Sequence, residues 1–536
     1  MFRKHTPQLG LFQPQYLFNK RLRREMERSW AHVFRYQIFP KIPEDPFRDL
    51  YADNTGAPNF PVRILIALSI LKELLGLRDV DLVHAFHFNA LFHYALWLTP
   101  GELTLSLRTL YNFRARIAGH EGMARVFETI TDEILSTARV CSEFQRIDSS
   151  QITSNMAHLS RLGLFVRTIE AFLKALGRRC PKRLAEVPEA LRARYLERRG
   201  YFADPREASQ ARRALEQAAQ DLAELIRRFE EVPEVRGLRS YGLLERLFAE
   251  QCRVESPAGA AEPVVVLCDP KEISSGSLQN PSDPDATYSA HKGKGYKVQI
   301  SETCAEANPF QVVTAVAVEP ANEGDVKALE PLLEQTERRG CAPKTVVADT
   351  SYGGAENLCM AAERGVDLLA PTPGKADPDN LTLMDFDLDP EGFTVRACPE
   401  GHEPVRRRAA ADGDGETLWF DRARCEACEH AASCPAGRDK GRMRVSWEDI
   451  VRAWNRARET TRAFRDLYRK RSGVEGTISE LKRAHGMGRV WTRGRDRVTM
   501  AVYFKVLACN VKRFARWWCA QAPAPEGAQC VFATPA

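Results

Sequence analysis

The chain has 536 residues, of which 44% are hydrophobic, 9% aromatic and 28% charged. This ordinary globular composition, over a length that favours several domains, excludes a wholly disordered chain, a collagen-like repeat and a small disulfide framework. The net charge of +6 is unevenly spread, because residues 441–520 carry 20 Lys and Arg against 7 Asp and Glu. This basic block on an otherwise acidic chain is either a solvated helical face or a contact surface for a polyanion.

The apolar segments do not resemble secretion or membrane signals. Residues 1–17 have no apolar core of the signal-peptide type. The most apolar long stretch, 85–100, is interrupted by two histidines and is too short to span a bilayer. The sequence therefore predicts a cytoplasmic protein without a membrane partner. In a reducing compartment, clustered cysteines indicate metal binding rather than disulfides.

Helical spacing dominates the first half of the chain. Apolar residues recur with a helical period over much of 1–140, which predicts an all-helical N-terminal domain. Short helices followed by arginines fit either a helix-turn-helix-like DNA-binding bundle or a plain helical scaffold. A short strand-like run lies in 141–156, and 157–260 returns to charged helical sequence, which indicates a helical insertion.

Strand signals follow in 261–372. Short apolar or alternating runs occur at 264–268, 295–301, 311–318 and 345–348. Helical segments lie between them, so an α/β domain with a mixed sheet is expected. Three further regions complete the chain. They are a turn-rich, cysteine-containing insertion at 373–445, a basic helical region at 446–520, and a disordered tail at 521–536. The basic region begins with one long helical pattern over 447–482 that is interrupted near Ser472 and Gly473.

Three carboxylates occupy positions that suit a shared site. Asp148 and Asp349 each come directly after a predicted buried strand, where α/β sheets display functional residues, although each alone could be a turn or cap residue. Glu475 shares a predicted helix with Tyr468, Arg471 and Lys482, and an ideal helix would place all four on one face. A salt-bridged surface helix is the simpler interpretation of that face.

The chemistry of these residues indicates phosphodiester cleavage. Two divalent cations can clamp the attacking and leaving oxygens of a phosphodiester, and Mg²⁺ prefers carboxylate, water and phosphate oxygens. Two aspartates and one glutamate would supply the carboxylates. Nearby arginine and lysine would hold neighbouring phosphates, and tyrosine could stack on a base.

The four helical residues, with the spacing Y-x₂-R-x₃-E-x₆-K, resemble the signature of bacterial insertion-sequence DDE transposases. The segments around Asp148 (QRIDSSQITSN) and Asp349 (VVADTSYGG) are also similar to that family, as is the N-terminal stretch from Tyr51 to Arg116. The resemblance covers most of the chain in the right order and looks closest to the group numbered 1182.

The resemblance implies an RNase H-like catalytic core that cuts DNA at transposon ends and joins the 3′-hydroxyl to target DNA in cut-and-paste transposition. Asp148, Asp349 and Glu475 would bind two Mg²⁺ or Mn²⁺ ions. Glu480 is the second choice for the third ligand, because it lies off the helical stripe. The expected DNA contacts are Tyr468, Arg471, Lys482, Arg483, Arg489 and Arg493.

Partners follow from the same resemblance. They are double-stranded DNA at the element's ends and at the target, with a homodimer on paired ends, in the nucleoid of a bacterial cell, and no small-molecule substrate. Two alternatives remain open on sequence: a catalytically idle DNA-binding protein derived from a transposase, and a metal-dependent nuclease without strand transfer.

Four cysteines form the pattern C-x₂₆-C-x₂-C-x₅-C at Cys398, Cys425, Cys428 and Cys434. Four thiolates can hold a tetrahedral structural Zn²⁺ ion, and the C-x₂-C pair is a good half-site. The outer cysteines lack a second close pair, so free cysteines in a turn-rich insertion are the alternative.

Overall fold

The computed structural model describes most of the chain. The described residues are 1–6, 13–53, 55–197, 208–256, 264–375, 379–389, 391–410 and 413–521. All of the predicted tail at 521–536 except Gln521 lies outside them. Among the described residues, no helix is both long and apolar enough to cross a membrane.

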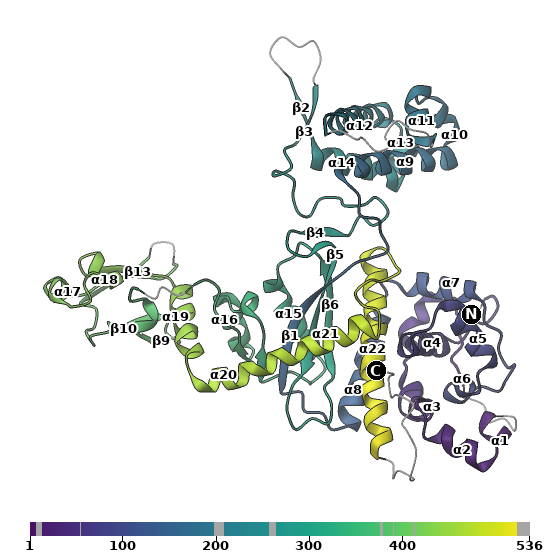
Figure 1. The fold of residues 1–536 in the computed structure, drawn as a ribbon, viewed down its shortest axis with the longest axis horizontal. Helices are drawn as coiled ribbons and strands as arrows, with labels where there is room; N and C mark the ends of the chain where they lie inside the picture. Colours follow the sequence, from purple (N-terminus) through teal and green to yellow (C-terminus); the bar gives the residue numbers. More distant parts are fainter. Residues whose placement is uncertain are drawn as a thin grey trace.

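Helices make up the N-terminal region, as its spacing predicted. They are α1 (Pro14–Leu17), α2 (Lys20–Glu27), α3 (Trp30–Val33), α4 (Val62–Leu75), α5 (Asp79–Phe88), α6 (Ala90–Ala95), α7 (Leu107–Ile117) and α8 (Gly122–Thr137), with the short turns η1 (Phe34–Ile38), η2 (Phe39–Lys41) and η3 (Asp45–Leu50) after α3. Most are short, and side chains such as Asn19 and Ser106 cap their first turns by accepting backbone N–H bonds. Helix α4 is buried along most of its length and packs against the C-terminal helix α22 (Arg495–Gln521), seen in yellow in Figure 1.

A mixed sheet lies at the centre of the molecule (Figure 1). Its strands are β1 (Phe144–Ile152), β4 (Thr287–Ser289), β5 (Gly293–Thr303), β6 (Val313–Pro320), β7 (Thr345–Val347) and β8 (Asp367–Leu369). The order is β6-β5-β1-β7-β8, with β4 also paired to β5. The strands β4, β5 and β6 run antiparallel to their neighbours, and β7 and β8 run parallel to β1. This is the strand order of an RNase H-like core, so the predicted fold class is confirmed.

Helices cover both faces of this sheet. One face packs on the segments η4 (Asp325–Ala328), α15 (Leu329–Glu337), η5 (Thr350–Tyr352), α16 (Ala355–Glu363) and α19 (Trp447–Glu459). The other face shares a large apolar core with the N-terminal helices, α22 and α21 (Gly473–Arg483). The N-terminal region and the sheet are therefore joined by a common core that α22 runs through.

The helical insertion has a core of its own. Its helices are α9 (Arg161–Arg179), α10 (Pro181–Ala185), α11 (Glu189–Leu196), α12 (Ala208–Phe229), α13 (Pro233–Arg236) and α14 (Arg239–Gln251). The run at 264–268, expected to be a buried strand of the central sheet, is instead β3 (Val264–Leu267), which pairs with β2 (Cys252–Glu255) in a separate two-stranded ribbon. Short apolar runs do not reveal their pairing partner, which explains the error.

The second insertion forms small sheets around another apolar cluster. Its elements are η6 (Leu383–Asp385), β9 (Asp387–Asp389), β10 (Thr394–Ala397), β11 (Arg406–Ala409), β12 (Glu416–Trp419), α17 (Arg422–Ala427), α18 (Pro435–Arg438) and β13 (Arg442–Val445). The helical pattern over 447–482 is divided into α19, α20 (Arg462–Tyr468), the 3₁₀ turn η7 (Arg469–Ser472) and α21. The interruption expected near Ser472 and Gly473 is the junction of η7 and α21, whereas the break between α19 and α20 was not expected. The cap at Thr461 starts α20 afresh, and the tighter η7 shifts the register expected for one continuous helix.

Candidate active site

Two aspartates are brought together by neighbouring parallel strands. Arg146 of β1 pairs with Val347 of β7, and Asp148 and Asp349 each lie two residues further on, so the sheet register places them side by side. Asp148 lies inside β1, which corrects the expectation that it follows the strand: the ladder with β5 continues to Ile152. Asp349 does follow its strand and caps η5, accepting a bond from the Ser351 backbone N–H at 2.9 Å.

The third carboxylate comes from a distant segment. Glu475 lies in the first turn of α21, which packs against β1. Its side chain is 69% exposed, whereas that of Asp148 is 12% exposed. The site therefore combines one fixed, buried carboxylate with one that is free to turn toward a ligand.

Arg471 of η7 joins the three acids. Its Nη2 lies 3.3 Å from Asp148 Oδ2 and 3.9 Å from Asp349 Oδ2, and its Nη1 lies 3.8 Å from Glu475 Oε1. Three carboxylates from three separate segments thus surround one guanidinium. The sequence predicted this convergence, but it did not predict that Arg471 would lie between the acids.

Burial and charge act in opposite directions on Asp148. Burial raises the pKa of its carboxyl, while the Ser149 N–H and Arg471 lower that pKa and the nearby Asp349 raises it. Burial also raises the pKa of the neighbouring Tyr352 well above its usual value, and this tyrosine donates to Gln299 at 2.6 Å. The site concentrates negative charge that a cation would relieve.

The donor set fits a hard divalent cation. All three groups are carboxylates, the ligand type that Mg²⁺ and Mn²⁺ prefer, and they already attract the cation Arg471. Among the described residues, the groups whose ligand atoms all lie within 4.8 Å of one another do not include this trio. Binding would require the exposed Glu475 to turn inward and Arg471 to move.

The other residues of the signature differ in their surroundings. Tyr468 ends α20 and stacks on Phe464, with ring centroids 5.7 Å apart. Its half-buried hydroxyl has a raised pKa, mainly through burial and partly through Asp349 and Asp148, so the tyrosine lies close to the acids. Lys482 and Arg483 are exposed at the far end of α21. The 3₁₀ turn between Tyr468 and Glu475 means that the stripe is not one straight helix face.

Two further predicted DNA contacts lie on a segment after α21 that pairs with Thr153, the residue that follows β1. Thr153 exchanges backbone hydrogen bonds with this segment, to Gly488 at 3.1 Å and from Val490 at 2.9 Å. Arg489 and Arg493 are exposed on it, and Arg489 lies over Trp491, a residue that is 75% exposed. The basic segment is therefore attached to the strand that carries Asp148.

A buried ion network that the sequence did not reveal holds α21 in place. Glu302 of β5 is fully buried and lies 2.6 Å from Arg146 and 2.7 Å from Arg513 of α22. Thr477 of α21 donates to Glu302 at 2.5 Å, and Arg146 donates to the Lys470 carbonyl at 3.0 Å. The network links β1, β5, η7, α21 and α22. Its only sequence signal is a charged residue within an apolar strand run.

The four cysteines of the second insertion line one pocket of about 750 Å³, together with His402 and His430. Burial raises the pKa of the Cys425 thiol, and the thiols of the other three cysteines raise it further, so they lie near one another. They are not among the described groups with ligand atoms within 4.8 Å, although Glu400, Glu429 and His430 at the same pocket are. The structure gathers the cysteines without setting a metal geometry.

The fold and this site define an RNase H-like α/β protein with three converging carboxylates. Comparison with family models finds a transposase DDE domain over residues 397–515 and a transposase domain over residues 15–116. The two matches lie in separate parts of the chain and both are transposase models, so they support a DDE transposase of an insertion-sequence family, which implies DNA as its partner. The matches do not resolve the group numbered 1182. Neither the curated proteins nor the solved structures contain a match.

Proposed function

We propose that this transposase binds the ends of an insertion sequence, cleaves the DNA there and joins the freed 3′-hydroxyl to target DNA. The observation that carries the proposal is the convergence of Asp148, Asp349 and Glu475 on Arg471. Carboxylates gathered from β1, the end of β7 and α21 concentrate more negative charge than one arginine balances. A site of this kind suits divalent cations and a polyanionic substrate.

The three carboxylates would hold two Mg²⁺ or Mn²⁺ ions. When bound, such ions activate the attacking oxygen and stabilise the departing 3′ oxygen of the phosphodiester. Asp148 and Asp349 supply ligands whose positions are fixed by the sheet, and Glu475 closes the site from α21. Arg471, released from the carboxylates, becomes free to pair with a phosphate.

The exposed basic residues would position the DNA. Lys482, Arg483, Arg489 and Arg493 would contact phosphates along α21 and the segment beyond it, and Tyr468 would meet the cleaved end. Residues 1–140 would form the end-binding domain. Residues 141–156, 261–372 and 446–520 would form the catalytic core, with 157–260 and 373–445 as insertions, and two copies would assemble on paired ends.

The test is cleavage of a DNA duplex that carries an end of the element, with Mg²⁺ present. Asp349→Asn should abolish cleavage while end binding remains within about twofold, since the change removes one charge at the edge of the site. Asp367→Asn is a matched control, because Asp367 is an aspartate at the start of the neighbouring strand β8 and pairs with Arg458 away from the site. Full cleavage by Asp349→Asn would contradict the assignment.

Two outcomes would separate the alternatives. Cut ends without insertions into a target plasmid would indicate a nuclease that lacks strand transfer. End binding without any cleavage, in a wild-type chain supplied with Mg²⁺ or Mn²⁺, would indicate an idle DNA-binding protein. Cleaved ends that are found joined to the target plasmid would support the transposition reaction.

We also propose that Cys398, Cys425, Cys428 and Cys434 hold a structural Zn²⁺ ion, supported by their gathering around one pocket. Metal analysis of the purified chain tests this. Replacing Cys425 and Cys428 with serine should remove about one zinc ion per chain. An unchanged zinc content would contradict the proposal.

A further inference from the structure

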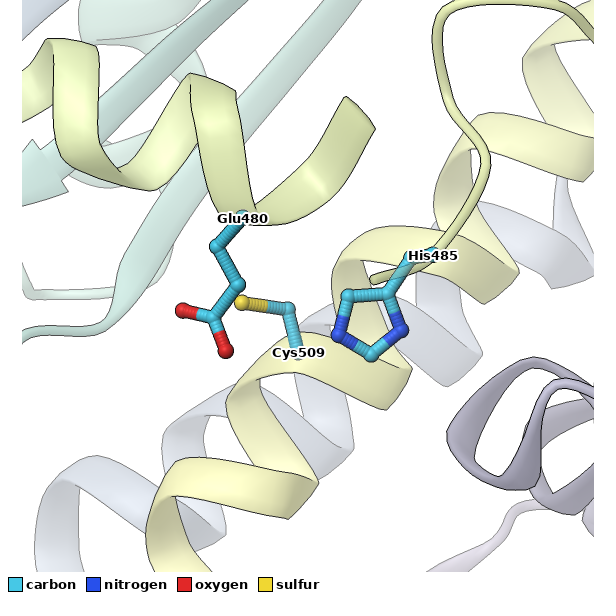
Figure 2. Close-up of side chains that lie close together, drawn as sticks. All are labelled: Glu480, His485 and Cys509. Carbon is cyan, nitrogen blue, oxygen red and sulfur yellow. The ribbon is translucent and has the colours of Figure 1, made fainter. Parts of the chain in front are cut away.

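A second group of side chains that could hold a metal ion lies at the end of α21 and on α22. Glu480 comes from α21, His485 from the turn that follows it, and Cys509 from α22 (Figure 2). A carboxylate oxygen, a ring nitrogen and the sulfur of these residues all lie within 4.8 Å of one another. Oxygen, nitrogen and sulfur donors from three residues are the ligand types that Zn²⁺ binds.

His485 is oriented as a metal ligand would be. Only 4% of the residue is exposed, and its Nδ1 lies 3.1 Å from the Glu73 carbonyl oxygen, so Nδ1 carries the proton and donates. Its Nε2 is buried and has no hydrogen-bond partner. Figure 2 shows the ring between the turn and α22, with one nitrogen facing the thiol and the carboxylate. Metal-binding histidines commonly donate their second nitrogen to a carbonyl in this way.

Ordinary core packing does not account for this nitrogen. Buried polar atoms in folded proteins are nearly always hydrogen-bonded, and leaving one unpaired costs about 1–3 kcal/mol. Because Nδ1 donates to the Glu73 carbonyl and Nε2 has no partner, the Nε2 lone pair is available to a ligand. The Nε2 lone pair therefore has no hydrogen-bond donor, and a bound cation would take the donor's place.

Two positive side chains lie near Glu480, but they leave lone pairs of its carboxylate available for a cation. Lys512 lies 3.4 Å and Arg513 3.0 Å from the Glu480 carboxylate, so two positive charges are near. Arg513 is also paired with Glu302 at 2.7 Å, which balances one of them. A carboxylate offers about four lone-pair sites, so Glu480 keeps room for a metal beside these bonds. Ligating carboxylates are commonly hydrogen-bonded in the same manner.

We propose that Glu480, His485 and Cys509 bind one Zn²⁺ ion that ties α21 to α22. Cys509 would bind as the thiolate and release its proton to solvent. Without an ion it is a buried neutral thiol, since burial raises its pKa to about 12. The side chain of Glu480 is 23% exposed, so water can reach the fourth position of a tetrahedral ion.

This site is independent of the proposed DNA chemistry. Glu480 lies five residues after Glu475, which is about 140° further round α21. The imidazole and the thiol are softer donors that suit Zn²⁺ better than Mg²⁺. An ion here would fix α21 to α22 in addition to the Glu302 network. Loss of the ion should therefore lower stability whether or not the chain cleaves DNA.

Zinc content measured on the full-length chain tests the proposal. The background carries Cys425→Ser and Cys428→Ser, so that the cysteine pocket does not contribute. After loading with zinc and desalting in Mg²⁺ buffer, this background should hold about one zinc ion per chain. Adding His485→Gln or Cys509→Ala should reduce the content at least fivefold.

Two matched controls separate ligand loss from general damage. His93 is a buried histidine whose Nε2 lies 2.8 Å from the Phe86 carbonyl, and Cys304 is a buried cysteine in another part of the core. His93→Gln and Cys304→Ala should keep the zinc. A zinc chelator should also lower the unfolding temperature of the background and leave the His485→Gln variant unchanged, if that variant folds.

The proposal fails on either of two results. The first is a background protein that holds no zinc after loading, which requires no substitution in the cluster. The second is a zinc content that stays at about one ion per chain in both ligand variants. Neither result would bear on cleavage at Asp148, Asp349 and Glu475, so the two proposals can fail separately.

Discussion

The carboxylates on the two sides of α21 differ in burial and in how closely they are paired. On one face, Glu475 is mostly exposed and shares Arg471 with two other carboxylates at distances of 3.3 to 3.9 Å. On the other, Glu302 is fully buried and is bonded at 2.5 to 2.7 Å by Thr477, Arg146 and Arg513. On the first side, the open face, the carboxylates have few close partners and can bind a ligand. On the second side, the supporting face, the carboxylate is fully hydrogen-bonded and holds the structure together. One helix thus separates binding from support.

The largest expected effect comes from the supporting face. Glu302→Gln removes the negative charge between two buried arginines and should lower the free energy of unfolding by about 3–5 kcal/mol. Glu475→Gln, the matched change on the open face, should alter it by less than about 0.5 kcal/mol. Denaturant titration followed by circular dichroism measures both. Equal losses would mean that the two faces do not differ as described.

Arg471→Gln tests whether this arginine competes with a metal ion for the three carboxylates. Arg471 competes with a cation for the three carboxylates, so the metal-free chain should bind Mn²⁺ about three- to tenfold more tightly without it. Calorimetric titration with Mn²⁺ in the absence of DNA measures this. Arg469→Gln is the control, since Arg469 is exposed in the same turn and pairs with Asp466 instead. Weaker Mn²⁺ binding by Arg471→Gln would show that the arginine supports the ion.

A smaller effect is expected on DNA binding. Affinity for end DNA should fall steeply with salt, and Arg489→Ala and Arg493→Ala should each reduce the slope of log affinity against log salt by about 1. Arg212→Ala in the helical insertion is the control, because Arg212 is exposed but pairs with Glu216. A flat salt response in the wild-type chain would argue against phosphate contacts by this segment.

The smallest effect concerns the packing of the N-terminal helices on α22. Burial alone would raise the pKa of Glu73, but Lys505 of α22 and Lys72 outweigh burial and hold it below its usual value. A carboxyl whose pKa is lower in the folded state stabilises the fold at pH values above its unfolded-state pKa of about 4.3. This stabilisation is lost as the pH falls through the folded-state pKa. The free energy of unfolding, measured from pH 6 to pH 3, should therefore decrease less steeply in Glu73→Gln than in the wild-type chain. A steeper fall would contradict the pairing.

The sequence predicted the open face better than the supporting one. Asp148, Asp349 and Glu475 stand in recognisable local patterns, and the sheet register then brings the two aspartates together. The position of Arg471 between the acids depends on the 3₁₀ geometry of η7; the sequence indicates an interruption near Ser472 and Gly473 but not this geometry. The roles of Glu302 and His485 depend on contacts between segments far apart in sequence. The pairing of β3 with β2 was missed for a different reason: the two strands are close in the chain, but a short apolar run does not indicate which strand it pairs with.

The central claim is that Glu475, rather than Glu480, completes the carboxylate site. The direct measurement compares Mg²⁺-dependent end cleavage by Glu475→Gln and Glu480→Gln, with DNA binding and folding checked for both. Loss of a metal-holding carboxylate should slow cleavage by about 10²- to 10⁴-fold in Glu475→Gln, while Glu480→Gln retains cleavage. Cleavage retained by Glu475→Gln and lost in a folded Glu480→Gln would contradict the account.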